Sequence, residues 1–357
     1  MRRFIAVATT SAALVVAGPA GAATWQVFAG EQARPPAGTP KGATLNAFFP
    51  SALQIHAGDK VKFTSTTFHT ASYLGGTRLP PPVAPDPAKG TYAGINDSTG
   101  APFFFNGLAK LIYNTAHFGP GGGTAVPGKG FVSTGVLSPG PNGRPVSATF
   151  TFPKTGTFKL LCAVHPGMTM NVAVRAAGAS VPDAAAVKAT ATAQTAAAWA
   201  KAPVLAAAKQ PARTVYAGIG GKTALLAFLP KKLTVKAGTT VNFINKSPSE
   251  PHNVGFGPKA YVEALMKKVD RFPFGPGQPN QVAPFFVYGS EPPGGYVYDG
   301  RNHGNGFLAT QLTDNQPGVP PRGLPGASRI KFTKAGRFHY ICLLHGPDMA
   351  GDIVVTP

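Results

Sequence analysis

The sequence is poor in cysteine and in negative charge. Two cysteines among 357 residues cannot build a disulfide framework. Thirteen acidic residues stand against 33 lysines and arginines, which gives a formal net charge of +20. The surplus is mostly dispersed lysine, without the arginine and aromatic interleaving of a nucleic-acid-binding face, so we expect no nucleic-acid partner. An acidic partner or an anionic cell surface fits the charge, and a basic surface kept for solubility fits it equally well.

Long apolar runs are also scarce, and the one that exists opens the chain. Arg2 and Arg3 precede an apolar stretch from Phe4 to Val16, which small residues close. This is the pattern of a secretory signal peptide, predicted here over residues 1–23. Adjacent arginines indicate the twin-arginine route only weakly, and the ordinary secretory route is favoured. No later run is long enough for a transmembrane segment, so the mature protein is expected in the periplasm, outside the cell or at its surface.

An internal repeat is present. Shifting the chain by 180 residues places AFFPSALQIHAGDKVKF (47–63) on AFLPKKLTVKAGTTVNF (227–243), and it places Cys162 on Cys342. A constant offset over this distance predicts duplication of a whole domain. A disulfide between the two cysteines would have to join the two repeats.

The repeats read as β-structure. Apolar residues alternate with polar ones at Leu53, Ile55, Val61 and Phe63, which is typical of half-buried strands. The 44 glycines and 37 prolines then belong to turns and loops between strands. We therefore predict an all-β protein made of two antiparallel β-sandwiches.

Residues 180–212 differ from the repeats because alanine dominates them. Pro182 and Asp183 are typical of a helix start, and Pro203 is expected to interrupt the helix. The predicted division of the chain is a signal peptide at 1–23, a first domain at 24–179, a helical linker at 180–212 and a second domain at 213–357.

Both cysteines lie in segments of metal-ligand spacing, CAVHPGM (162–168) and CLLHGPDM (342–349). In each, a histidine follows the cysteine by three residues and a methionine comes soon after. A second histidine follows the strand GDKVKF in the first repeat and GTTVNF in the second. Two histidines, one cysteine and a weak axial methionine are the ligands of copper sites that pass single electrons, whereas zinc more often takes four cysteines or histidines. The expected ligands are His69, Cys162, His165 and Met168, and His252, Cys342, His345 and Met349.

Each repeat resembles a cupredoxin, the blue copper family of plastocyanin and amicyanin. The resemblance is carried by PHNVGF around His252, by MAGDIVV (349–355) and, more loosely, by FHTASY around His69. The spacing C-x2-H-x2-M of the first repeat is the short form seen in amicyanins. The second, C-x2-H-x3-M, lies between that form and plastocyanin. The resemblance implies Greek-key sandwiches, two type 1 copper ions per chain, and one-electron exchange with redox partner proteins.

Two other functions remain open at this point. A nitrite reductase-like enzyme or a two-domain multicopper oxidase would need a histidine just before each cysteine or H-x-H pairs, but Leu161 and Ile341 precede the cysteines and no H-x-H occurs. A further type 2 copper would have to use His117 and His303, which lie in glycine-rich insertions. Copper storage or delivery would use the same ligands as electron transfer.

Overall fold

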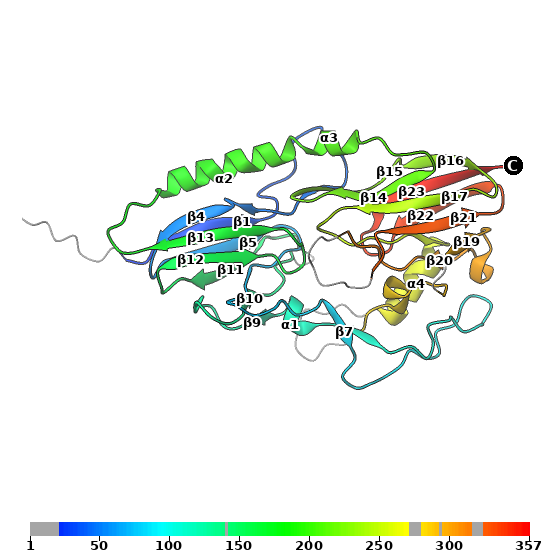
Figure 1. Ribbon diagram of the computed structural model, residues 1–357, viewed down its shortest axis with the longest axis horizontal. Coiled ribbons are helices and arrows are strands. Elements are labelled where there is room, and N and C mark those ends of the chain that lie inside the picture. Colours follow the sequence, from blue (N-terminus) through cyan, green and yellow to red (C-terminus); the bar gives the residue numbers. More distant parts are fainter. Residues whose placement is uncertain (1–20, 140–141, 271–279, 293–294, 316–323) are drawn as a thin grey trace, which may run out of the picture.

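The computed structural model describes residues 21–139, 142–270, 280–292, 295–315 and 324–357 (Figure 1). These residues form an elongated all-β protein with a few helices, which confirms the predicted fold class. The predicted signal peptide lies almost entirely outside the described residues. No helix of the described part combines the length and apolarity needed to cross a membrane.

The first sandwich is built from two sheets. One has the strand order β11-β5-β1-β3, and the other has the order β4-β13-β12-β6-β10-β9. Their strands are β1 (Thr24–Ala29), β3 (Phe48–Phe49), β4 (Ala52–His56), β5 (Lys60–Ser65), β6 (Ser72–Tyr73), β9 (Pro120–Gly121), β10 (Val132–Thr134), β11 (Val146–Thr151), β12 (Gly156–Leu161) and β13 (Thr169–Arg175). Strands β1 and β5 run parallel, as do β4 and β13, while β12 pairs antiparallel with β13.

The second sandwich follows the same plan. Its sheets have the orders β19-β21-β17-β14-β15-β2 and β16-β23-β22-β18-β20. Their strands are β2 (Ala43–Leu45), β14 (Thr214–Gly220), β15 (Thr223–Leu229), β16 (Lys232–Lys236), β17 (Thr240–Lys246), β18 (Gly255–Phe256), β19 (Tyr296–Tyr298), β20 (Leu308–Ala309), β21 (Ala327–Phe332), β22 (Gly336–Cys342) and β23 (Gly346–Thr356).

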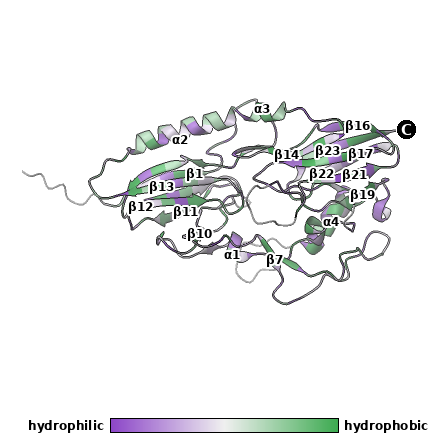
Figure 2. Cartoon of the chain, in the orientation of Figure 1, coloured by the Kyte–Doolittle hydropathy of each residue, from purple (hydrophilic) through white to green (hydrophobic). Residues whose placement is uncertain are grey.

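Alternation of apolar and polar residues explains how each sandwich closes. In β5, Val61 and Phe63 are fully buried while Lys60 and Lys62 are exposed. Figure 2 shows the same alternation of hydrophobic and hydrophilic residues along strands such as β13 and β23. Successive side chains of a strand point to opposite faces, so each sheet offers one apolar face and the two faces close into a core.

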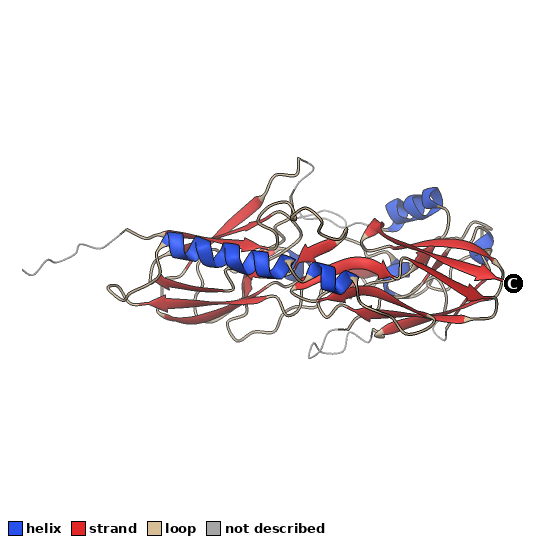
Figure 3. Ribbon diagram, turned by 90° about the horizontal axis from the view of Figure 1, so that it is seen from above, coloured by secondary structure: helices blue, strands red, loops and turns tan. Residues whose placement is uncertain are grey.

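The alanine-rich linker is helical, as predicted. It forms α2 (Ala184–Trp199) and α3 (Ala202–Ala206), which run along the outside of the molecule (Figures 1 and 3). Asp183 caps α2 by accepting a hydrogen bond from the Ala186 N–H, and Pro203 sits in the first turn of α3 after the interruption. Trp199 is buried in a cluster with residues of the 45–49 segment, so the linker packs against the body of the protein.

The two sandwiches are tied together along their length. Strand β2 comes from the N-terminal part of the chain but pairs with β15 as the edge strand of a second-sandwich sheet. Two long insertions, one between β6 and β10 and one between β18 and β20, also share a third apolar cluster. Tyr92, Phe105, Leu265 and Phe285 belong to this cluster. The remaining elements lie in these insertions: β7 (Val83–Pro85), β8 (Leu111–Tyr113), α1 (Thr115–Phe118), α4 (Lys259–Val269), α5 (Pro284–Val287) and the 3-10 turn at Asn302–Gly304.

Candidate metal centres

The first candidate centre gathers three of the predicted ligands in the first sandwich. The Nδ1 atoms of His69 and His165 lie 3.9 and 3.5 Å from the Sγ of Cys162. All three side chains are buried, and their ligand atoms lie within 4.8 Å of one another. Residues 93 positions apart therefore meet around a thiol that is 2% exposed.

The second candidate centre repeats the arrangement in the second sandwich. The Nδ1 atoms of His252 and His345 lie 3.9 and 3.4 Å from the Sγ of Cys342. The same two nitrogens are 3.1 Å from each other. His345 is the most open member of the group, while the other two are fully buried.

Strand ends and tight loops position the ligands. Cys162 follows β12, and its N–H donates to the carbonyl of Met168, whose own N–H donates to the carbonyl of His165. These two bonds, 2.9 and 3.1 Å long, close the loop on itself. In the second sandwich, Cys342 ends β22 and pairs with Gly346 across the turn.

The predicted axial methionines are buried close to these loops. Met168 belongs to the same apolar cluster as Cys162, and Met349 belongs to the same cluster as Cys342. Each is 1% exposed. Their assignment as ligands remains a prediction. Met170 is equally buried and lies in the strand β13, as expected for a core residue.

The electrostatics of both groups favour a thiolate. Burial disfavours ionisation of Cys162, but the imidazole of His165 and then that of His69 lower the pKa of the thiol well below its ordinary value. Burial likewise disfavours ionisation of Cys342, but the imidazoles of His345 and His252 lower the pKa of its thiol well below the ordinary value. Burial opposes the charge on His345 too, yet the Cys342 thiolate and Glu250 raise its pKa to about 10. Each cysteine is therefore ready to act as a thiolate ligand, which is the form that binds metal ions.

The donor set fits a soft transition-metal ion. Each group offers two imidazole nitrogens and one sulfur within reach of a single ion, and these are ligands that suit copper. Among the described residues, only these two groups bring one ligand atom from each of three histidine, cysteine, aspartate or glutamate side chains within 4.8 Å of one another.

Two glycines shape the groups and were not found from the sequence. A Cβ on Gly30 would lie 2.3 Å from the Nε2 of His69, and one on Gly218 would lie 2.0 Å from the Nε2 of His252. Both glycines have positive φ angles, +83° and +73°. The imidazoles therefore occupy space that only glycine leaves open. Gly30 follows β1, whereas Gly218 lies at a register shift within β14, and Ala-Gly pairs recur elsewhere in the chain, so no sequence signal marks these two.

The residue after His69 and the residue after His252 hold the cysteine loops. Thr70 Oγ1 accepts a 2.7 Å hydrogen bond from the N–H of Ala163, and the Thr70 N–H lies 3.3 Å from the Cys162 sulfur. Asn253 Oδ1 likewise accepts a 2.8 Å bond from the N–H of Leu343. These bonds fix each cysteine loop to the segment that carries the first histidine.

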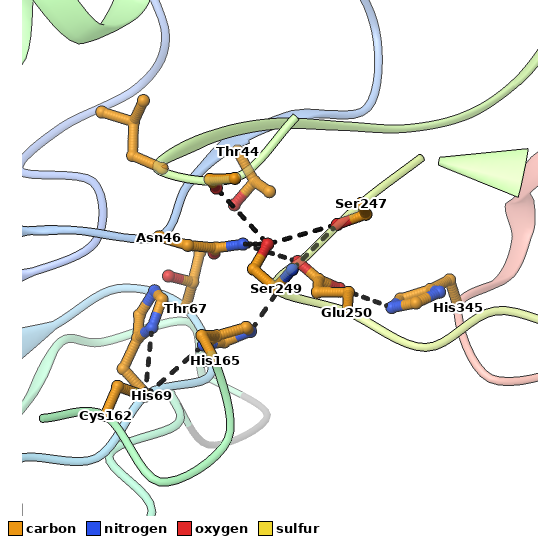
Figure 4. Close-up of polar contacts among 12 residues, drawn as sticks. Thr44, Asn46, Thr67, His69, Cys162, His165, Ser247, Ser249, Glu250 and His345 are labelled. Carbon is orange, nitrogen blue, oxygen red and sulfur yellow. Dashed lines mark hydrogen bonds and ion pairs between the residues drawn. The ribbon is translucent and has the colours of Figure 1, made fainter. Parts of the chain in front are cut away.

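Glu250 was also missed, because it precedes His252 in a polar stretch that reads as a loop. It is 5% exposed, and its Oε2 accepts a 2.8 Å hydrogen bond from the Nε2 of His345. The imidazoles of His345 and His165 hold the pKa of this carboxyl well below its usual range, although burial acts in the opposite direction. Figure 4 shows Glu250 between His165 of the first group and His345 of the second.

The two insertion histidines belong to neither group. His117 is buried, and its Nδ1 lies 2.6 Å from the carbonyl oxygen of Pro80. His303 lies between two carboxylates, with its Nδ1 3.1 Å from Asp97 and its Nε2 2.9 Å from Glu291. Asp97 comes from the first half of the chain, so His303 helps to join the two insertions.

One part of the chain matches a family of known proteins. Residues 215–284 match the family model described as copper binding proteins, plastocyanin/azurin family. Solved structures similar to the chain include amicyanin from Paracoccus versutus, with 20% identity over 43% of this chain and 88% of that one and a TM-score of 0.23. A mutant amicyanin in the Cu(I) form has 21% identity over 43% of this chain and 89% of that one, also with a TM-score of 0.23. A search of curated proteins found no match.

Proposed function

Because residues 215–284 match a copper-binding family and the chain carries two His-Cys-His groups of like geometry, we propose that it is an exported two-domain blue copper protein of the cupredoxin family that carries single electrons. The observation that supports this most directly is the convergence of two Nδ1 atoms on each buried cysteine sulfur. The proposal includes duplication of a cupredoxin domain, with domains at 24–179 and 213–357 flanking the linker.

The residues that would hold copper are the ones expected from the sequence. The first site would use His69, Cys162, His165 and Met168, and the second would use His252, Cys342, His345 and Met349. Both methionines are buried beside the cysteine loops, as an axial thioether requires. Copper in such a site exchanges one electron at a time without substrate chemistry.

The chain's own contribution is to keep these ligands fixed. His69 and His252 pack against Gly30 and Gly218, and the hydrogen bonds to Thr70 and Asn253 tie each cysteine loop to the segment that carries the histidine. Burial of the thiols excludes water from the sulfur. A preformed site of this kind changes little between two oxidation states of a bound ion, and this favours fast electron exchange.

An additional catalytic copper has less support. His303 is engaged with two carboxylates, and His117 lies outside both ligand groups of the described residues. Leu161 and Ile341 precede the cysteines, where an enzyme would place a bridging histidine. Storage or delivery of copper would leave the same ligands in place, and release of the ion on reduction would distinguish it.

The proposed partners are redox proteins that dock on a basic surface. The net charge of +20 favours acidic proteins or an anionic cell surface through long-range attraction, which salt weakens. The proposed location is the periplasm or the outside of the cell, as the N-terminal segment indicates.

Copper content, visible spectra and electron paramagnetic resonance of the copper-loaded protein test the proposal together. Two coppers per chain, an intense thiolate band and narrow hyperfine splitting at both sites are expected, and the copper should survive repeated reduction and oxidation. A third copper with a type 2 signal would instead support an enzyme. Loss of copper on reduction would support storage or delivery.

A further inference from the structure

One carboxylate lies between the outer edges of two candidate ligands from different sandwiches. The Oε2 of Glu250 accepts the hydrogen bond from His345 Nε2 at 2.8 Å, and its Oε1 lies 3.7 Å from His165 Nε2. Both imidazoles point their Nδ1 atoms at their own cysteine and their Nε2 atoms at this glutamate (Figure 4). The contact to His345 is a hydrogen bond, whereas the longer one to His165 is a charge contact.

Glu250 is held in this position by Asn46, from the N-terminal half of the chain. Asn46 donates from Nδ2 to Glu250 Oε1 at 2.8 Å and to Ser249 Oγ at 3.1 Å. The N–H of Asn46 in turn donates to the carbonyl of Lys222, next to the pairing of β2 with β15. The glutamate therefore lies in a built interface, with hydrogen bonds to both halves of the chain.

The outer nitrogen of a metal-bound histidine has a definite role. Its N–H usually donates to a carboxylate or carbonyl, which fixes the ring orientation and the tautomer and makes the ligand more basic. For His345 this acceptor is in its own sandwich. For His165, the acceptor that its Nε2 faces among the described residues comes from the other sandwich.

We propose that Glu250 is a shared positioning residue for both metal sites, so that the first site is completed by a carboxylate from the second sandwich. This inference rests on the proposed function, because it requires that both groups bind a metal ion. Since one side chain supports two sites, occupancy of either site bears on the other, and the coupling is reciprocal.

The test isolates each site in the full-length chain. Cys342→Ser leaves the first site intact, and Cys162→Ser leaves the second. Glu250→Gln is then added to each, since it keeps the shape of the side chain but removes its charge and one of its two acceptor oxygens. The probe is Co²⁺ alone, titrated against a competing chelator and followed by the thiolate charge-transfer band. The melting temperature of the metal-free protein is recorded for every variant.

Glu250→Gln is expected to weaken Co²⁺ binding at both sites. The loss should be about 10- to 100-fold at the second site, which has the direct hydrogen bond, and about 10-fold at the first, where the contact is longer. Ser249→Ala is the matched control. It removes an inter-sandwich hydrogen-bond acceptor next to Glu250 without touching a ligand, so affinity at both sites should stay within about twofold.

Two outcomes would overturn the proposal while leaving the proposed function standing. The first is an unchanged first site beside a weakened second site, which would assign Glu250 to the second site alone. The second is an equal loss at the first site in Ser249→Ala, which would assign the effect to packing of the interface. Absence of a thiolate band with Co²⁺ in both single-site variants would reject the proposed function, and this inference with it.

A second substitution keeps the proposal testable if Glu250→Gln does not fold. Glu250→Asp retains the charge but is one methylene shorter, so it cannot approach both imidazoles at once. At least one site should then lose affinity by about 10-fold. Wild-type affinity at both sites in Glu250→Asp would contradict the proposal.

Discussion

The imidazole of His252 packs directly on the α-carbon of Gly218, where a Cβ would lie 2.0 Å from its Nε2 atom. Gly30 stands in the same relationship to His69 in the first sandwich, with a Cβ distance of 2.3 Å. Each ring is therefore held by main chain, and its position depends on a missing side chain.

Gly218→Ala should displace His252 and weaken metal binding at the second site by at least about 10-fold, leaving the first site intact. The added methyl cannot be accommodated without moving the ring, and the positive φ of +73° adds about 1 kcal/mol of strain. Co²⁺ titration of the thiolate band measures the loss. Gly238→Ala is the control, because its φ is +86° but nothing lies within 4 Å of the new methyl. Equal binding losses in both variants would trace the effect to backbone strain alone.

Cys162→Ser and Cys342→Ser should each abolish one of the two proposed copper sites. The sulfur is the centre of each ligand group, and a hydroxyl does not replace a thiolate as a copper ligand. Copper content should fall from two per chain to one, and about half of the visible thiolate absorption should remain. The double variant should have no thiolate band. If either single change bleached both bands or neither, the model of two independent ligand sets would be wrong.

Met168→Leu and Met349→Leu should keep the thiolate band but raise the reduction potential of the altered site. The thioether supports the oxidised ion, and an apolar side chain of similar size removes that support. Protein film voltammetry measures the change. Met170→Leu is a matched control, since Met170 is just as buried in the first-sandwich core and lies outside the predicted ligand set. A potential that moves equally in Met168→Leu and Met170→Leu would argue against Met168 as a ligand.

Asn253→Ala should lower the free energy of unfolding by about 1 to 3 kcal/mol, because it leaves the buried N–H of Leu343 without its acceptor. Thr70→Val should have a similar effect through the N–H of Ala163, while keeping the size of the side chain. Denaturant unfolding of the metal-free protein gives both values. Stability unchanged in both variants would mean that these bonds do not secure the cysteine loops.

The contact of His303 with Asp97 and Glu291 should make stability depend on pH. Burial opposes the charge on His303, but hydrogen bonds to Glu291 and Asp97 raise its pKa above the ordinary value. The contribution of His303 to the free energy of unfolding is therefore complete below about pH 6.5, and it is lost as the pH rises through the raised pKa of the folded protein. Burial also acts against the charge on Asp97, but the hydrogen bonds from Thr99 and His303 lower its pKa, so the carboxylate persists below pH 4.

His303→Asn is the variant to compare, because asparagine tolerates the positive φ of 53° at this position. It should cost about 1 to 2 kcal/mol at pH 5 to 6 and less at pH 9. Denaturant midpoints of the metal-free wild type and variant, taken at each pH, measure the difference. A difference that stays constant from pH 5 to 9 would show that the histidine charge plays no part.

Much of the fold follows from local patterns. Alternation at Val61 and Phe63 predicts a half-buried strand, and β5 is one. The alanine-rich stretch between Asp183 and Pro203 predicts a helix that is interrupted near the proline. The structure shows this interruption between the end of α2 and the start of α3. These features depend on backbone preferences and on burial of one face, which short stretches of sequence encode.

The site was predictable only in part, for a physical reason. Cysteine and histidine are rare here and recur at one offset, so their spacing brings them to notice. Glu250 and Gly218 act through contacts between segments far apart in the chain, and neither has a spacing that marks it. The role of β2 could not be predicted either. This three-residue strand lies between strands of the first sandwich in the sequence, and nothing in the sequence indicates that it pairs with β15.

The pairing of β2 with β15 also means that the two halves are not separable modules. A polypeptide holding residues 213–357 alone would lack residues 43–45, and the hydrogen-bonding edge of Thr223–Leu229 would face water. Open edges of this kind recruit other strands, including those of identical chains. The C-terminal half produced alone would therefore be prone to self-association, and its solubility depends on a segment from the other half of the chain.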